Sequence, residues 1–190
     1  TLDMDIKIPY TPRKHQKLLH QQIDKHRWSV LVCHRRFGKT VCMINHLIKS
    51  ALMSKQKNPR FAYLAPTFKQ AKSIAWDYMK QFTDKIPHTK FNETELRVDL
   101  PNGARIALLG SDSPDGLRGI YLDGCVIDEY ANVNSRLFPE IIRPALSDRK
   151  GYCVFIGTPA GMNNNFYELY QHANGADDWF NYKAKASDTK

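Results

Sequence analysis

The stretch Ser29–Thr40, SVLVCHRRFGKT, is an apolar run that stops at a basic loop and closes on Gly-Lys-Thr. This order is typical of a P-loop, whose backbone N–H groups surround a triphosphate while a lysine reaches the β- and γ-phosphates and a hydroxyl binds Mg²⁺. Lys39 and Thr40 fit these two roles. Apolar residues recur at helical spacing over 41–52, so a helix with its positive N-terminal end at the phosphates is expected next. A strand, a loop and a helix thus follow in the order that the motif needs.

The loop departs from the usual pattern G-x-x-x-x-G-K-[ST] at its first position, where this chain has Cys33. Cysteine does not tolerate positive φ as glycine does, so the loop is expected to start along a different backbone path. The alternative interpretation is a plain strand-turn-helix in which Lys39 is a solvated surface charge. The residues that we expect to contact the nucleotide are Gln16, His34, Arg35, Arg36, Phe37, Gly38, Lys39 and Thr40.

Gln16 lies upstream of the loop, on a helix for which Thr11 is the expected cap and Pro12 falls in the first turn. A glutamine amide can donate to N7 of adenine and accept from N6 at the same time. We therefore expect Gln16 to read adenine, with Tyr10 or Arg13 beside the ring. A glutamine on the wet face of an ordinary helix is the alternative.

Two acids, Asp128 and Glu129, end a buried strand in the manner of the second nucleotide-site motif of P-loop enzymes. The first is expected to hold Mg²⁺ beside Thr40, and the second to polarise the attacking water. Two acids that merely begin a loop are the alternative. Another apolar strand stops at Thr158, whose hydroxyl would lie near the γ-phosphate in a parallel sheet.

The alternation of strand and helix patterns predicts an α/β fold of the P-loop NTPase (RecA/ASCE-like) type, with a mostly parallel central sheet flanked by helices. An antiparallel hairpin over 96–100 and 104–109 is expected at the sheet edge. Further strands are expected over 60–65, 152–157 and 180–186, and further helices over 68–82, 135–147 and 166–172.

Composition bounds the class of protein. The chain has 190 residues, 42% of them hydrophobic, which suffices for one domain with a sizeable core. Its formal net charge of +9 suits a polyanionic partner such as nucleic acid. The four cysteines lie in apolar segments without C-x-x-C spacing, so buried thiols are expected rather than disulfides or zinc. Neither a membrane-spanning run nor a signal peptide is found in the sequence.

Taken together, these motifs resemble the ATPase domain of the large terminase subunit of tailed bacteriophages, the motor that packages DNA into preformed capsids. Their order and spacing make the resemblance specific, and Arg35 stands where the family places an arginine. The segments that carry it are Arg13–Gln16, Cys33–Thr40, Ala65–Thr67 with Gln70 and Ala71, Leu117–Gly119, Val126–Glu129 and Gly157–Pro159.

The resemblance implies ATP and Mg²⁺ as ligands, and double-stranded viral DNA, the portal protein of the procapsid and a small terminase subunit as partners. It further implies a ring of subunits, five in number, at the portal in the host cell cytoplasm, without a membrane and without secretion. Residues 1–178 are expected to form the ATPase domain. Residues 179–190 would form the final strand and the start of a linker toward a C-terminal nuclease absent here, so DNA cleavage is not expected.

Two arginines are candidates for the arginine finger that offsets charge in phosphoryl transfer. Arg35 would act on its own subunit's ATP, whereas Arg118 lies in a glycine-flanked loop that could reach a neighbouring subunit. We expect Arg118 to act in trans. The alternative for Arg118 is a surface ion pair with Asp115 or Asp123.

Two rival functions follow from the same motifs. A helicase-like nucleic-acid translocase shares the upstream glutamine and both nucleotide motifs, but such enzymes usually need a second RecA-like domain. A nucleotide-binding interaction module without turnover is the other rival, and the intact Glu129 argues against it.

Overall fold

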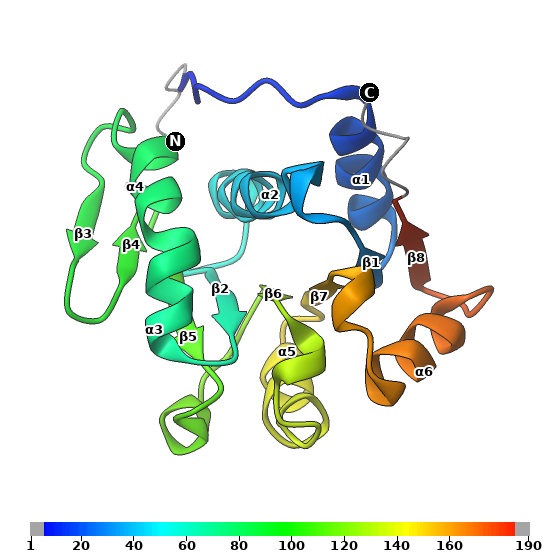
Figure 1. Ribbon diagram of the computed structural model, residues 1–190. Coiled ribbons are helices and arrows are strands. Elements are labelled where there is room, and N and C mark those ends of the chain that lie inside the picture. Colours follow the sequence, from blue (N-terminus) through cyan, green and yellow to red (C-terminus); the bar gives the residue numbers. More distant parts are fainter. Residues whose placement is uncertain (1–5, 185–190) are drawn as a thin grey trace.

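One eight-stranded sheet, in the order β3-β4-β5-β2-β6-β7-β1-β8, forms the centre of the computed structural model (Figure 1). The structure describes residues 6–184, and of Asp115 only the backbone. The strands are β1 Trp28–Val32, β2 Arg60–Ala65, β3 Lys90–Asn92, β4 Arg97–Asp99, β5 Arg105–Gly110, β6 Gly124–Ile127, β7 Tyr152–Gly157 and β8 Trp179–Lys183. Neighbours from β5 to β8 in this order pair in parallel, while β3 and β4 add antiparallel strands at one edge. The predicted fold class, including the antiparallel edge, is confirmed.

Helices cover both faces of the sheet. In Figure 1, α1, α2 and α4 lie on its upper side, whereas α5 and α6 lie below. The α-helices are α1 Lys14–Lys25, α2 Lys39–Met53, α3 Phe68–Ala71, α4 Asp77–Thr83, α5 Arg143–Ser147 and α6 Asn164–Ala173. Short 3₁₀ turns are η1 Arg35–Phe37, η3 Pro114–Leu117, η4 Tyr130–Asn132 and η6 Pro159–Gly161, and π-helical turns are η2 Lys72–Trp76 and η5 Phe138–Ile142.

The two faces of the sheet feed two separate apolar clusters. Along β2, Phe61 and Tyr63 belong to the cluster under α1 and α2, whereas Ala62 and Leu64 belong to the cluster under α5 and α6. Strands β1, β6 and β7 are buried along their whole length, except for a half-buried Tyr152. Covered on both faces, such strands read as continuous apolar runs rather than as alternating ones.

The parallel pairing brings three chain segments to one edge of the sheet. Val32 at the end of β1 pairs with Gly157 at the end of β7, and the Cys33 N–H donates to the Gly157 carbonyl at 2.9 Å. The third strand, β6, lies on the other side of β7 and ends at Ile127. Ligands of open α/β sheets bind beyond the carboxyl ends of such strands. The fold therefore places the loop after β1, the acids after β6 and Thr158 after β7 side by side.

Element boundaries differ from expectation in three places. Helix α1 begins at Lys14 with Arg13 as its cap rather than Thr11, because the Gln16 side chain accepts from the Arg13 N–H at 2.9 Å and closes a capping box. The short edge strand β3 was not predicted, since three residues carry no periodicity. The last strand ends at Lys183, and residues 185–190, where the expected linker would start, lie outside the described residues.

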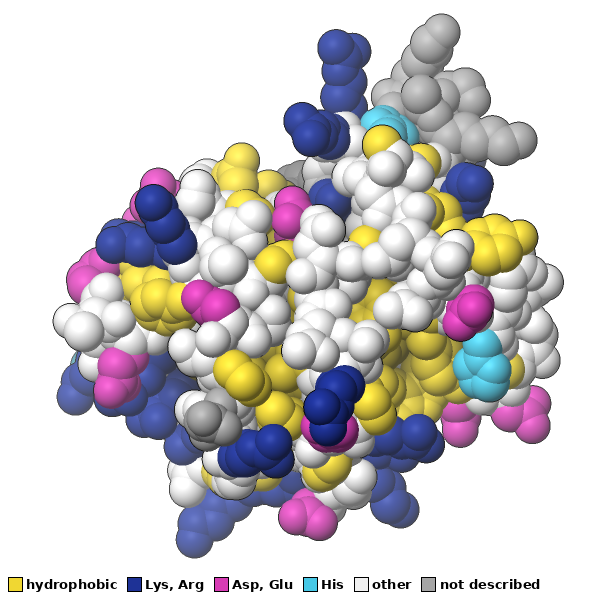
Figure 2. Space-filling view, turned by 60° about the horizontal axis from the view of Figure 1, so that its bottom comes forward, with side chains coloured by type: hydrophobic (Ala, Val, Ile, Leu, Met, Phe, Trp, Pro, Cys, Tyr) yellow, Lys and Arg dark blue, Asp and Glu magenta, His cyan; other side chains and the backbone are white. Residues whose placement is uncertain are grey.

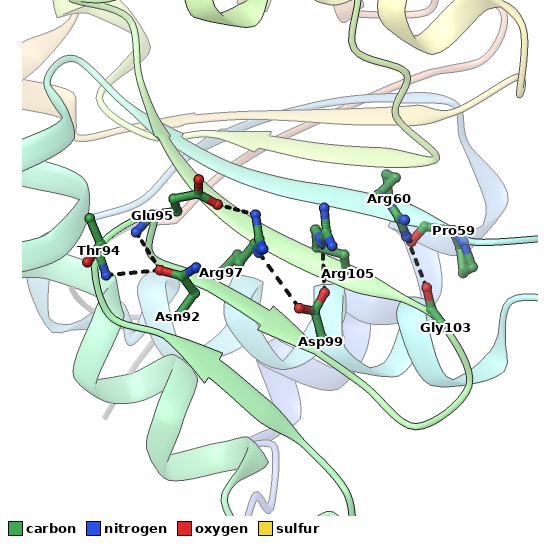
Figure 3. Close-up of polar contacts among 9 residues, drawn as sticks. All are labelled: Pro59, Arg60, Asn92, Thr94, Glu95, Arg97, Asp99, Gly103 and Arg105. Atoms are coloured by element: carbon green, nitrogen blue, oxygen red, sulfur yellow. Dashed lines mark hydrogen bonds and ion pairs between the residues drawn. The ribbon is translucent and has the colours of Figure 1, made fainter.

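Ion pairs fix the edge of the sheet (Figure 3). Asp99 on β4 lies between two arginines, with its carboxylate 2.7 Å from Arg105 Nε and 3.7 Å from Arg97 Nε. Arg97 also pairs with Glu95, and Arg60, whose Cα partner is Arg105, donates to a backbone carbonyl at 3.0 Å. These arginines are thus engaged within the chain, across β2, β5 and β4.

All four cysteines are buried and free, as predicted. Burial raises the pKa of Cys33 to about 12 and that of Cys42 to about 12, so both remain thiols. Within residues 6–184, the search for a helix of the length and apolarity that a bilayer requires finds none.

Candidate active site

The loop between β1 and α2 turns at Gly38, which adopts φ 77°. A side chain is excluded there on two grounds. Left-handed φ disfavours residues with a Cβ, and a Cβ at this position would lie 2.7 Å from Arg13 Nη2 and 3.0 Å from Gln16 Nε2. The glycine of the Gly-Lys-Thr motif is therefore required by the fold.

Arg13 and Gln16 hold the loop from behind. Arg13 Nη2 donates to the Phe37 carbonyl at 2.5 Å, and Gln16 Nε2 donates to the Gly38 carbonyl at 3.3 Å. The Gln16 side chain is only 4% exposed, and its oxygen is engaged by the Arg13 N–H. The sequence predicted an adenine contact for Gln16, whereas the structure spends both ends of its amide on backbone groups. The reason is that α1 packs its N-terminal turn against the back of the loop.

Tyr10 also lies away from the loop's open side. Its hydroxyl is 2.9 Å from His20 Nε2, and its ring meets Phe82 edge-on at 6.1 Å. Nδ1 of His20 is 2.8 Å from Nδ1 of His46, and burial lowers the pKa of His20 to about 4. This neutral polar cluster joins α1 to α2, so Tyr10 serves as packing there.

The loop side chains divide between core and surface. Phe37 is fully buried, with its ring 4.5 Å from that of His15, so this residue presents only backbone to a nucleotide. Arg35 and Arg36 are exposed and His34 is half-buried. Of these four loop residues, Arg35 alone is found among the described residues that line the adjacent cavity.

A cavity of about 560 Å³ opens at this edge of the sheet. The predicted site residues that line it are Arg35, Gly38, Lys39, Thr40, Asp128, Glu129 and Thr158. They come from four separate stretches of the chain, which the parallel strands bring together. The motifs after β1, β6 and β7 therefore form one site.

Asp128 is the most deeply buried acid of the site, at 2% exposure. Its Oδ1 is 3.8 Å from Lys39 Nζ and accepts from the Glu129 N–H at 2.8 Å, while its Oδ2 accepts from the Tyr63 hydroxyl. Burial, followed by the Asp128 charge, raises the pKa of Tyr63 well above its usual range, and the Thr40 side chain acts in the opposite direction. Tyr63 therefore stays a protonated donor.

The donors at this site are hard oxygens, which suit Mg²⁺. Among the described residues, no group of three or more His, Cys, Asp or Glu side chains could hold a metal. Mg²⁺ needs no such group when it binds with a nucleotide, because phosphate oxygens and water fill most of its six positions. The Thr40 hydroxyl and the Asp128 carboxylate, both lining the cavity, fit that arrangement.

Glu129 leaves the strand direction at once. It adopts φ 48° and is half-buried, so the chain turns sharply after Asp128 and directs Glu129 to the cavity wall. A left-handed backbone at a residue other than glycine, asparagine or aspartate is uncommon and is concentrated at functional sites. This conformation separates the two adjacent acids into two positions.

Several cavity residues carry no motif in the sequence, among them Ile74, Tyr78, Asn132 and Gly161. The helical pattern predicted that Tyr78 faces the core, but Tyr78 is 41% exposed and lines the cavity. The π-helical turn η2 precedes it and changes the helical phase of the residues that follow. No sequence signal marks that turn.

Arg118 is exposed and follows η3, outside the set of described residues that line the nucleotide cavity. It borders a separate hollow of about 200 Å³ together with Arg136 and Glu140. Asp123, one partner considered for it, pairs with Arg149 at 3.5 Å. The structure therefore keeps Arg35 and Arg118 apart, with only Arg35 at this chain's own cavity.

Comparison with known proteins matches residues 32–188 to the family described as terminase large subunit, T4likevirus-type, N-terminal. The large terminase subunit of Thermus phage G20c is 31% identical over 56% of this chain. That match covers 26% of the relative, so this chain spans about a quarter of the length of the curated relatives it matches.

Solved structures agree in fold. The large terminase ATPase domain of Thermus phage P74-26 superposes with a TM-score of 0.78 over 95% of this chain and 84% of that one, at 23% identity. A large terminase from a thermophilic bacteriophage, in complex with ADP, gives 0.75 over 92% and 46%, at 16% identity. With the family model covering most of its length, this chain belongs to the T4likevirus-type large terminase family, in its N-terminal domain.

Proposed function

We propose that this chain binds ATP with Mg²⁺ and hydrolyses it as the motor domain of a viral DNA-packaging terminase. One observation carries the proposal: Lys39, Thr40, Asp128, Glu129 and Thr158 line a single cavity at the carboxyl edge of the sheet. The relative from Thermus phage P74-26 is described as a terminase ATPase domain, which supports the same activity here.

Each residue has one task in this proposal. Lys39 leaves its pairing with Asp128 and meets the β- and γ-phosphates, while the N-terminal end of α2 faces the same oxygens. Glu129 orients the attacking water, and Thr158 senses the γ-phosphate. When bound, Mg²⁺ bridges phosphate oxygens and offsets their charge.

The partners proposed are double-stranded viral DNA, the portal of the procapsid and a small terminase subunit, with the subunits arranged as a ring of five in the host cell cytoplasm. Lys and Arg side chains gather along the lower side of the face in Figure 2, while acidic ones are scattered. The family places the nuclease in a separate domain, so cleavage is not assigned to residues 1–178. Residues 179–190 hold β8 and the proposed start of the linker.

DNA binding is expected to depend on phosphate contacts. Affinity for duplex DNA should then fall steeply as salt rises and vary little among sequences, because neutralised phosphates release counterions whatever the bases. Fluorescence anisotropy of labelled duplexes of two unrelated sequences, over 50–200 mM salt, measures both. A salt-independent, sequence-selective interaction would contradict the proposal.

The finger proposal, with Arg118 acting on a neighbour's ATP, is tested by mixing two inactive variants. Arg118→Ala chains keep Lys39, and Lys39→Ala chains keep Arg118. In a mixed ring, the intact Arg118 of one chain can serve the intact Lys39 site of the next, so phosphate release should recover partly. Mixing Arg118→Ala with Arg118→Ala, Lys39→Ala double variants is the matched control and should stay inactive. No recovery in mixtures shown to co-assemble would leave Arg35 as the finger.

A further inference from the structure

Tyr63 lies beneath the floor of the active site and is fully buried. It belongs to β2, in register with Val126 of β6, and Asp128 directly follows that strand. Side chains alternate along a strand, so Tyr63, Val126 and Asp128 all face α2. The Tyr63 hydroxyl meets the Asp128 carboxylate there and donates to Oδ2.

The two Asp128 oxygens have different surroundings. Oδ1 accepts from the Glu129 N–H at 2.8 Å and is the oxygen 3.8 Å from Lys39 Nζ. Oδ2 accepts from Tyr63, which comes from a different strand. Each carboxylate oxygen has two acceptor positions, so one donor on each oxygen leaves the other position open. Held at both oxygens, the carboxylate cannot rotate freely about its bond to Cβ.

We propose that Tyr63 is a positioning residue for the metal ligand Asp128, and this inference rests on the proposed function. By donating to Oδ2, Tyr63 fixes the plane of the carboxylate so that its open acceptor positions face Thr40, where the nucleotide-bound Mg²⁺ would lie. Outer hydrogen-bond partners of metal-ligating carboxylates commonly set ligand orientation in this way, and their loss costs about 10- to 100-fold in metal affinity or activity.

A merely structural role makes a different prediction. The Tyr63 ring belongs to the apolar cluster under α2, and phenylalanine would fill the same space. If the hydroxyl only satisfied a buried polar atom, its removal would lower stability and leave the Mg²⁺ requirement unchanged. The Mg²⁺ requirement is therefore the quantity that separates the two roles.

The test compares Tyr63→Phe with Tyr152→Phe. The control removes the Tyr152 hydroxyl, which is 2.9 Å from Ser50 Oγ, on the same side of the sheet but away from Asp128. Equilibrium binding of a fluorescent ATP analogue is measured while Mg²⁺ is titrated, and again in EDTA. Tyr63→Phe should raise the Mg²⁺ concentration at half-effect about 10-fold or more, with analogue affinity in EDTA unchanged. Tyr152→Phe should leave both values at those of the unmodified chain.

The Asp128→Asn background supplies the decisive comparison. If Tyr63 acts through the carboxylate, adding Tyr63→Phe to Asp128→Asn should shift the Mg²⁺ midpoint no further. An unchanged midpoint in Tyr63→Phe, or an equal shift in both backgrounds, would overturn the inference. An unmodified chain whose analogue binding ignores Mg²⁺ would instead overturn the proposed function itself.

A second readout does not depend on the stability of Tyr63→Phe. Incorporation of 3-fluorotyrosine at position 63 keeps the ring and its hydroxyl, and the fluorine resonance reports on the Asp128 contact. Addition of Mg²⁺ to the ATP-bound chain should move this resonance, and Asp128→Asn should suppress the movement. A resonance that does not respond to Mg²⁺ would contradict the positioning role.

Discussion

Replacing Lys39 with alanine is expected to lower ATP hydrolysis at least about 100-fold and to weaken ATP binding. Lys39 Nζ is the cation of the Gly-Lys-Thr motif, and it lies at the cavity wall 3.8 Å from the Asp128 carboxylate. A preorganised donor aimed at developing charge contributes about 10²–10³ in turnover. Arg35 cannot take its place, because its side chain leaves from η1 on the exposed side of the loop. Phosphate release and titration with a fluorescent ATP analogue measure the two effects.

Lys49→Ala is the matched control for this change. Lys49 is on the same helix, α2, but its side chain is 51% exposed and pairs with Asp24 at 3.3 Å. Exposed pairs of this kind contribute little, so Lys49→Ala should retain turnover. Near-normal hydrolysis in Lys39→Ala would mean that the loop after β1 does not hold the phosphates.

Glu129→Gln is expected to keep ATP binding and to reduce turnover by about 10²–10⁴, the usual contribution of a positioned acid or base. Glutamine has the same size, so it can occupy the half-buried position and the turn at φ 48°. It lacks the carboxylate that would polarise the water. Analogue binding should therefore match the unmodified chain while steady-state phosphate release is nearly lost.

The control for this prediction is Glu140→Gln, which alters an exposed acid paired with Arg136 at 2.9 Å, outside the nucleotide cavity. It should leave both binding and turnover unchanged. Hydrolysis by Glu129→Gln at the rate of the unmodified chain would place the catalytic acid elsewhere in the site.

The parts of the site that the sequence predicted are those set by local order. A strand, a glycine turn and a helix in direct succession place Lys39 and Thr40, and a strand end places Asp128. Parallel pairing then collects such strand ends at one edge, so Thr158 could be expected beside them. The family assignment agrees with this interpretation and favours a packaging motor over a helicase-like translocase.

The parts that sequence reasoning missed depend on contacts between distant segments. Gln16 was expected at adenine, but the packing of α1 behind the loop engages its amide with the Gly38 carbonyl. Tyr78 reads as a core residue, and a π-helical turn that has no sequence signal exposes it at the cavity. Tyr63 reads as an ordinary residue of a buried strand, because its contact with Asp128 arises only when β2 and β6 pair.

The central claim is that the cavity at the ends of β1, β6 and β7 hydrolyses ATP with help from a neighbouring subunit. Steady-state phosphate release by the unmodified chain, measured with Mg²⁺ or EDTA over a series of chain concentrations, tests this most directly. The account predicts release that requires Mg²⁺ and rises more steeply than in proportion to chain concentration, because Arg118 acts in trans. ATP that binds the chain without any release, at concentrations where subunits are shown to associate, would contradict it.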